Sequence, residues 1–147
     1  MTRKLTNILV TGGAGFIGCN FIHFMFSDES GFSGKIINVD CLTYAGNAES
    51  LKDVDEKYGE LAVKNGLISK ENQRYFFEKV DICDGPAIDA ILKKYHIDTI
   101  VHFAAESHVD RSILGPEAFV KTNVMGTFNL LDLAKNYWQN EDGTIRN

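Results

Sequence analysis

The stretch Val10–Gly18, "VTGGAGFIG", decides the fold, because it places four glycines in nine residues between two apolar segments. The run before it, Asn7–Thr11, has the apolar composition of a short strand, and Phe16–Phe26 after it has helical spacing. A loop that leaves a strand and opens a helix presents unpaired N–H groups and the positive end of the helix dipole. The stretch therefore predicts a loop that holds an anion such as a pyrophosphate.

The glycine spacing fits two related dinucleotide-binding patterns. Gly13, Gly15 and Gly18 form G-x-G-x-x-G, and Gly12 with the last two forms G-x-x-G-x-x-G. Asp40 follows Gly18 by 22 residues, at the end of the next apolar run, where a carboxylate can accept a hydrogen bond from a ribose 2′-hydroxyl. A carboxylate there disfavours a 2′-phosphate, so the sequence predicts NAD as the cofactor, in preference to NADP.

Strand-like and helical segments alternate along the chain. The predicted strands are Asn7–Thr11, Lys35–Asp40, Arg74–Val80 and Asp98–Ala104, and the predicted helices are Phe16–Phe26, Gly85–Tyr95 and Gly115–Trp138. Parallel strands need helical crossovers, so this rhythm predicts an α/β fold, a Rossmann-like doubly wound parallel sheet that stops after about four strands in the order 3-2-1-4. We expect a single domain over residues 1–147. Asp53–Gln73 interrupts the rhythm and predicts a surface excursion with one short helix that ends near Gly66.

Composition narrows the class of protein. The 147 residues carry a net charge of -5 without a basic block, which argues against nucleic-acid binding. Cys19, Cys41 and Cys83 have no zinc-type spacing and indicate reduced thiols in a cytoplasmic protein. No segment has the ~18 consecutive apolar residues of a membrane span. The histidines have no partners at ligand spacing, so no metal site is expected.

Several longer motifs resemble one family. The sequence is similar to the extended short-chain dehydrogenase/reductase superfamily and, within it, to the dTDP-sugar dehydratases. The whole superfamily shares "TGGAGFIG". The dehydratases are indicated by "LTYAGN" at 42–47, "DICD" at 81–84, "AAESHVDRSI" at 104–113 and "TNVMGT" at 122–127. These motifs cover most of the chain in the family's order.

The resemblance implies a set of site residues. Asp81 and Ile82 match adenine contacts, and Ala104 and Ala105 match positions where small side chains let the backbone approach the cofactor. Ser107 and His108 match positions toward the sugar nucleotide. The full set implied for NAD is Gly12, Gly15, Phe16, Ile17, Gly18, Asp40, Cys41, Leu42, Thr43, Asp81, Ile82, Ala104, Ala105, Ser107 and Thr122. The family commonly has a basic residue where this chain has Cys41.

The resemblance also implies a reaction. Family members act on dTDP-glucose: NAD oxidises C4 of the sugar, water is lost across C5 and C6, and the hydride returns to C6. A Tyr and a Lys four residues later, together with a Thr-Asp-Glu run, do this chemistry after the fifth strand, and we expect them beyond Asn147. Tyr75 and Lys79 have the right spacing, but two strand residues four apart are ~13 Å apart, so we expect no catalytic residue in this chain. Full-length members are expected to form homodimers.

Two other interpretations remain open from the residues. The chain can be a stand-alone NAD-binding or partner-binding module. It can also belong to another nucleotide-sugar epimerase or dehydratase of the same superfamily, because the dinucleotide motif is common to all of them.

Overall fold

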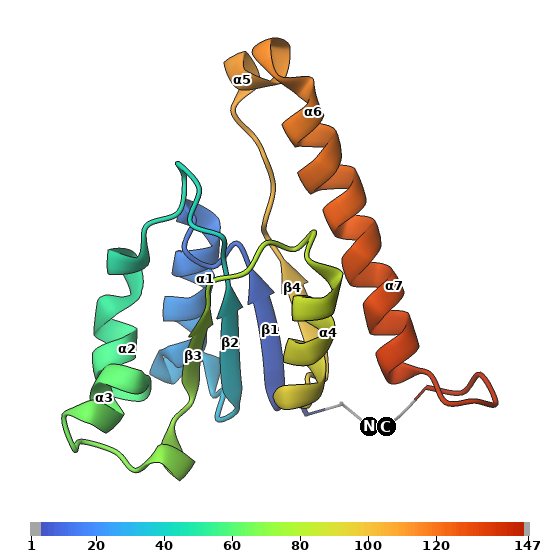
Figure 1. Cartoon of the computed structure of the whole chain (residues 1–147). Coiled ribbons are helices and arrows are strands. Elements are labelled where there is room, and N and C mark those ends of the chain that lie inside the picture. The colour runs from blue at the N-terminus through green and yellow to red at the C-terminus, as the bar shows by residue number, and fades with distance from the viewer. Residues whose placement is uncertain (1–3, 146–147) are drawn as a thin grey trace.

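The computed structural model describes residues 4–145, which form a parallel four-stranded sheet covered by helices (Figure 1). The sheet order is β3-β2-β1-β4, as the sequence predicts. The strands are β1 (Asn7–Thr11), β2 (Lys35–Val39), β3 (Tyr75–Glu78) and β4 (Thr99–His102). β1 has its predicted bounds, whereas the other three strands are one to three residues shorter than predicted, mainly because their last predicted residues belong to the loops at the sheet's carboxyl edge.

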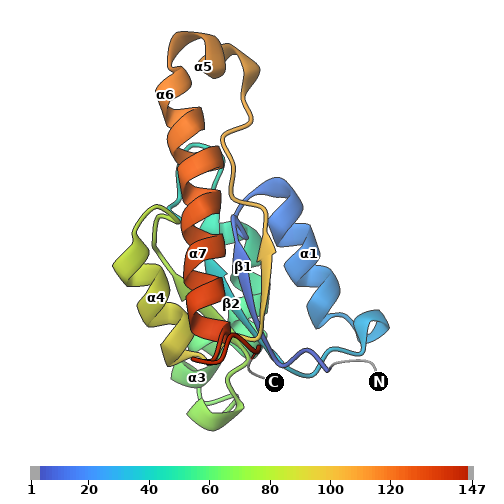
Figure 2. The ribbon, with the colours of Figure 1, turned by 90° about the vertical axis from the view of Figure 1, so that its right-hand side faces the viewer.

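Helices cover both faces of the sheet (Figure 2). Helix α1 (Phe16–Phe26) lies on one face, and α4 (Gly85–Lys94) and α7 (Thr127–Trp138) lie on the other. The central strands are buried on both sides, which explains why their sequences are apolar throughout. Ile8 and Val10 of β1 pack toward α1, whereas Leu9 of the same strand packs toward α4 and α7.

The segment between β2 and β3 corrects the predicted surface excursion. It holds two α-helices, α2 (Lys52–Tyr58) and α3 (Glu60–Lys64), and the 3₁₀ turns η2 (Ala48–Leu51) and η3 (Lys70–Asn72). Val54 is 3% exposed and Ala62 is fully buried, so part of the core lies here. The predicted stop at Gly66 is confirmed. Its φ of 70° lets Leu67 N–H donate to the Ala62 carbonyl (2.9 Å), which closes the last turn.

The third strand lies at one edge of the sheet, as the predicted strand order implies. It is less buried than its apolar residues suggest, since Phe77 is 38% exposed. Apolar composition does not distinguish an edge strand from a central one when helices cover both faces. The other edge within residues 4–145 is β4.

The predicted long helix over Gly115–Trp138 is present as three joined pieces. They are α6 (Pro116–Phe119), the π-helical segment η4 (Val120–Gly126) and α7, which follow one another without a break (Figure 1). Side chains bind two carbonyls of η4: Cys83 Sγ lies 3.4 Å from that of Lys121, and Thr127 Oγ1 donates to that of Asn123 (2.8 Å). The sequence did not predict the short helix α5 (Val109–Leu114) or the 3₁₀ turn η1 (Asp28–Ser30).

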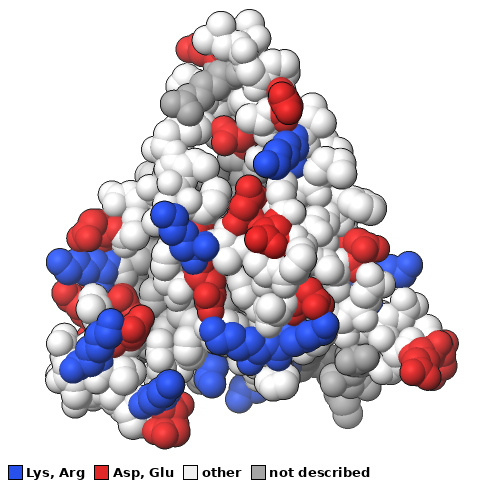
Figure 3. Space-filling model, in the orientation of Figure 1, with Lys and Arg blue, Asp and Glu red and all other residues white. Residues whose placement is uncertain are grey.

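The surface carries both signs of charge. On the face shown in Figure 3, basic and acidic side chains are interspersed over most of the elements. Within residues 4–145, no helix combines the length and the apolar character needed to cross a membrane.

Candidate functional site

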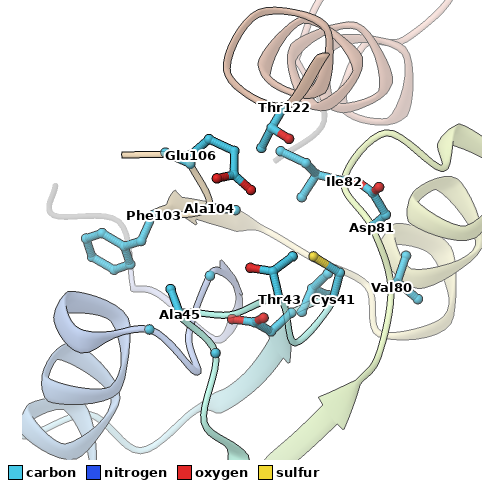
Figure 4. Close-up of a pocket in the computed structure, with 16 residues that line it drawn as sticks. Cys41, Thr43, Ala45, Val80, Asp81, Ile82, Phe103, Ala104, Glu106 and Thr122 are labelled. Carbon is cyan, nitrogen blue, oxygen red and sulfur yellow. The ribbon is translucent and has the colours of Figure 1, made fainter. Parts of the chain in front are cut away.

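A cavity of about 130 Å³ lies at the carboxyl edge of the sheet. Its walls come from the loops after all four strands and from η4, and their side chains converge on one space (Figure 4). Ligands of open α/β sheets bind at this edge, beside the strand order reversal between β1 and β4. The lining residues are Gly12, Gly15, Val39, Asp40, Cys41, Thr43, Ala45, Gly46, Val80, Asp81, Ile82, Phe103, Ala104, Ala105, Glu106 and Thr122.

The glycine loop forms one wall, and its glycines serve two purposes. Gly12 has a φ of 68°, and a Cβ there would lie 2.5 Å from Ala104 N. A Cβ at Gly18 would lie 2.3 Å from the Gly12 carbonyl oxygen. The fold itself therefore needs these two glycines. Gly15 differs, because a Cβ there would meet only the Gly12 oxygen, at 3.3 Å, so protein packing alone does not require a glycine.

Gly15 also precedes the first turn of α1. It is the N-cap residue, no side chain caps the helix, and no acidic residue lies in the first turn. The Gly15 carbonyl accepts from Cys19 N–H (2.9 Å), the first bond of the helical pattern. The N–H groups of the helical residues before Cys19 therefore have no acceptor within the helix. The space that a Cβ would fill, together with free helix N–H groups, suits a phosphate.

Asp40 lies beneath this loop at the end of β2 and is 8% exposed. One carboxylate oxygen accepts from Ala14 N–H (3.0 Å) and the other from Leu42 N–H (2.8 Å). Leu42 turns back toward Asp40 with a φ of 54°. The two bonds fix the carboxylate and leave further lone pairs on each oxygen for a hydroxyl donor.

The loop after β3 forms the opposite wall and is tied to the long helix. Asn129 Nδ2 donates to the Ile82 carbonyl (2.6 Å). The Ile82 side chain packs against Gly126, where a Cβ would lie 2.5 Å from Ile82 Cδ1. Asp81 Oδ1 accepts from Cys83 N–H (2.9 Å), which shapes the turn at the cavity wall.

The loop after β4 is held by a paired contact with η4. Asn123 Oδ1 accepts from Glu106 N–H (2.8 Å), and Asn123 Nδ2 donates to the Glu106 carbonyl (2.9 Å). Glu106 and Thr122 therefore reach the cavity from segments that one side chain joins (Figure 4).

The cavity has negative electrostatic character. Asp40, Asp81 and Glu106 line it, and no Lys or Arg does among the residues whose side chains the structure describes. The effect is visible at Cys41, whose thiol pKa is raised above 9.0 by burial and by the charges of Asp40 and Asp81. A phosphate group placed beside Asp40 and Asp81, away from the start of α1, would meet the same repulsion.

Most of the predicted site residues meet at this cavity. Ten line it, whereas Phe16, Ile17, Gly18, Leu42, Ser107 and His108 do not. Phe16 (85%) and Ile17 (65%) are exposed, and the His108 ring contacts that of Tyr44, with 6.2 Å between centroids. The roles of all these residues stay predictions. Sequence reasoning missed six lining residues: Val39, Ala45, Gly46, Val80, Phe103 and Glu106. Ala45, Gly46 and Glu106 lie within the motifs "LTYAGN" and "AAES". The other three lie at or beside the end of a strand, which was the signal available for finding them.

Tyr75 and Lys79, which have the spacing of the catalytic pair, are not among the residues that line the cavity. Tyr75 begins β3, is 4% exposed and accepts a hydrogen bond from Asn38 Nδ2 (3.1 Å). Burial raises the pKa of Tyr75 to about 12 despite this bond, so its hydroxyl is a poor base at neutral pH.

Comparison with known proteins identifies relatives. The family described as GDP-mannose 4,6 dehydratase matches residues 9–146. A dTDP-glucose 4,6-dehydratase of Haemophilus influenzae is 47% identical over 94% of this chain and 36% of its own length. The chain thus spans about a third of the length of such relatives.

Solved structures agree with this relationship. A dTDP-glucose 4,6-dehydratase of Streptomyces venezuelae, solved with NAD bound, is 38% identical, with a TM-score of 0.73 over 90% of this chain and 36% of that one. A UDP-glucose 4-epimerase of Thermotoga maritima is 30% identical, with a TM-score of 0.68 over 90% of this chain and 35% of that one. The expected resemblance to the dTDP-sugar dehydratases is confirmed. Because the family match extends over nearly all of its residues, the chain belongs to the GDP-mannose 4,6 dehydratase family.

Proposed function

We propose that this chain is the NAD-binding part of a dTDP-glucose 4,6-dehydratase. The observation that carries the proposal is the pairing of an uncapped helix start at Gly15 with the oriented carboxylate of Asp40 in one cavity. The first suits a pyrophosphate and the second a ribose hydroxyl. We infer the reaction from the relatives, which are named dTDP-glucose 4,6-dehydratases.

Each wall of the cavity has a role in holding the cofactor. The first N–H groups of α1 donate to the pyrophosphate, and Asp40 accepts from the adenosine ribose. Asp81 and Ile82 lie where an adenine would be held by a carboxylate and a backbone N–H, and Ala104, Ala105 and Thr122 face the nicotinamide half. NAD supplies a hydride acceptor when bound. The chain's own residues bind it, orient it and keep its reactive end at the sheet's carboxyl edge.

The charge of the cavity supports NAD as the cofactor, in preference to NADP. A 2′-phosphate would sit beside Asp40 and meet the field that raises the pKa of the Cys41 thiol through burial, Asp40 and Asp81. We therefore expect the chain to bind NADP more weakly than NAD.

Ser107 and His108 extend from the loop after β4, next to the cavity wall at Glu106. We assign them to the sugar-nucleotide side of the site. A 4-epimerase would use the same cofactor cavity, but the relatives at 47% identity are dehydratases and the epimerase structure is 30% identical. The dehydratase is therefore the better assignment.

An exposed apolar stripe on the long helix supports a homodimer. Val120, Val124, Phe128 and Leu131 recur at helical spacing on one face, and each is at least 56% exposed. A contiguous apolar face of this kind marks an interaction surface.

The proposal is tested by calorimetric titration with NAD and, in parallel, with NADP. Wild type is compared with Asp40→Asn, which removes the charge, and with Glu60→Gln, which makes the same change on exposed helix α3. A hydrogen bond to a charged group contributes about 1.5–3 kcal/mol, so Asp40→Asn should weaken NAD binding about 10- to 100-fold. Glu60→Gln should leave it unchanged. A folded wild-type chain that does not bind NAD would refute the assignment.

The reaction is tested separately with the gene product that contains this chain. Incubated with NAD and dTDP-glucose, it should form dTDP-4-keto-6-deoxy-glucose. Conversion to dTDP-galactose would instead identify a 4-epimerase.

A further inference from the structure

His102 ends β4 and lies between β1 and the long helix. Its Nδ1 is 2.6 Å from Thr11 Oγ1, and its Nε2 is 3.0 Å from Thr127 Oγ1. Thr11 is the last residue of β1, directly before Gly12, and Thr127 is the first residue of α7, directly after the segment that carries Thr122. One side chain therefore joins the glycine-loop strand to the helix above the cavity.

The neighbouring hydrogen bonds fix where the imidazole carries its proton. The Thr127 hydroxyl donates to the Asn123 carbonyl (2.8 Å), so its oxygen can only accept from His102. Nε2 must then bear the proton, and Nδ1 of the neutral ring accepts from the Thr11 hydroxyl. Thr11 Oγ1 is free to donate, since its other contact is with Ala104 N–H (3.4 Å), which itself donates. Every polar group of this chain of contacts is satisfied by the Nε2–H form.

Protonation of the ring breaks this pattern. A second proton on Nδ1 would face the Thr11 hydroxyl, which would lose its acceptor. Part of His102 is exposed at the sheet edge, but its ring nitrogens lie between β1 and the helix, and burial lowers the pKa of His102 below 6.5. Thr11, Thr127 and Asn123, the groups that face the ring, do not titrate, and no charged residue contributes to the shift.

The contacts continue from the helix to the cavity. Asn123, whose carbonyl accepts from Thr127, pairs through its side chain with the backbone of Glu106. The connected path runs from Thr11 through His102, Thr127 and Asn123 to Glu106. Its two ends, Gly12 beside Thr11 and Glu106, both line the cavity.

We propose that His102, as the neutral Nε2–H tautomer, is a positioning residue that ties the long helix and the loop after β4 to the end of β1, and so holds the cavity in its dinucleotide-binding shape. The inference rests on the proposed function. Because the folded state favours the neutral ring, the contribution of His102 is complete above pH 6.5 and is lost as the pH falls through the lower pKa of the folded state.

The test uses two variants that remove the contacts in different ways. His102→Phe keeps a ring of similar size, and Thr127→Val keeps the shape of the acceptor side chain. A neutral hydrogen bond contributes about 0.5–1.5 kcal/mol, so each variant should raise the Kd for NAD about two- to tenfold at pH 7.5. The double variant should be little worse than the worse single variant, since both break the same path. His23→Gln, at the exposed contact with Asp53, is the control and should bind as wild type.

Two further readouts separate positioning from general destabilisation. Nitrogen-15 NMR of wild type should show Nε2 protonated and Nδ1 unprotonated, with a pKa below 6.5 that falls further in Thr127→Val, because valine cannot accept a hydrogen bond from the ring. NAD affinity of wild type should fall as the pH is lowered from 7.5 through the folded-state pKa found by NMR, and that of His102→Phe should fall less. An Nδ1–H tautomer, a pKa at or above 6.5, or a folded His102→Phe variant with wild-type affinity would overturn the proposal.

Failure of the proposed function would give a different set of results from failure of the role of His102. If wild type does not bind NAD, the cofactor assignment and the binding role of His102 both fall. The tautomer, together with amide hydrogen exchange of Asn123–Thr127 in His102→Phe, then decides whether the tie to the helix exists. Unchanged exchange in that variant would refute the tie as well.

Discussion

Replacement of Gly15 by alanine should separate cofactor binding from folding. The position has a φ of -79°, which any residue adopts, and the new Cβ would approach only the Gly12 carbonyl oxygen, at 3.3 Å. The methyl group would occupy the space beside the free N–H groups of α1, where the phosphate has to approach. Loss of one charge-assisted hydrogen bond corresponds to about 1.5–3 kcal/mol, so NAD binding should weaken about 10- to 100-fold.

The matched variant is Gly18→Ala. Its Cβ would lie 2.3 Å from the Gly12 oxygen and 2.7 Å from Gly13 Cα, both backbone atoms that cannot move without distorting the loop. Overpacking of this kind costs about 1–3 kcal/mol, which lowers the Tm by about 2–4 °C for each kcal/mol in a domain of this size. Thermal melts and calorimetric titration of both variants test the difference. The reasoning is refuted if Gly15→Ala binds NAD as tightly as wild type, or if it melts as early as Gly18→Ala.

Three further predictions concern acid stability, thiol reactivity and association. Asp98→Ala should destabilise the fold by about 1–3 kcal/mol at pH 7, since the N–H groups of Thr6 and Asn7 lose their acceptor. Burial raises the pKa of Asp98, but hydrogen bonds to its carboxylate, led by that from Thr6, outweigh burial and lower the pKa below 3.8. Urea titrations should therefore show that the difference in unfolding free energy between wild type and Asp98→Ala shrinks as the pH falls through that lower pKa. Cys41 has a pKa raised by burial, Asp40 and Asp81, so its alkylation, followed by peptide mass spectrometry, should be slow at pH 8, accelerate above pH 9 and be blocked by NAD. An alkylation rate unaffected by NAD would place the cofactor elsewhere. Leu131→Glu, at a side chain that is 66% exposed, should reduce self-association in sedimentation velocity without lowering the Tm; unchanged association would exclude this stripe as the dimer surface.

The glycine loop and Asp40 could be predicted because local sequence encodes them. Glycine spacing reports where a Cβ would collide, as at Gly12 and Gly18, and an acidic residue at a strand end is placed by the strand itself. The sheet order followed from the same alternation of strands and helices.

The parts that sequence reasoning missed depend on contacts between distant segments. Glu106 reaches the cavity because Asn123, 17 residues later, holds its backbone. In the π-helical segment, the Lys121 carbonyl is contacted by Cys83 Sγ from another loop (3.4 Å). Phe103 packs on Phe21, with 5.4 Å between ring centroids, and it also lines the cavity. Composition cannot separate these two roles.

The order of the strands has a consequence for how the chain folds. Thr11 of β1 and His102 of β4 are neighbours in the sheet but stand 91 residues apart in the sequence. Closing a loop of that length is slow, so β1 pairs with its second neighbour only after most of the chain has been organised. Until then one side of the most buried strand offers unpaired N–H and C=O groups to any other extended segment. A refolding experiment should therefore gain α1 and β2 early and NAD binding last, and aggregation should compete mainly during the interval between them.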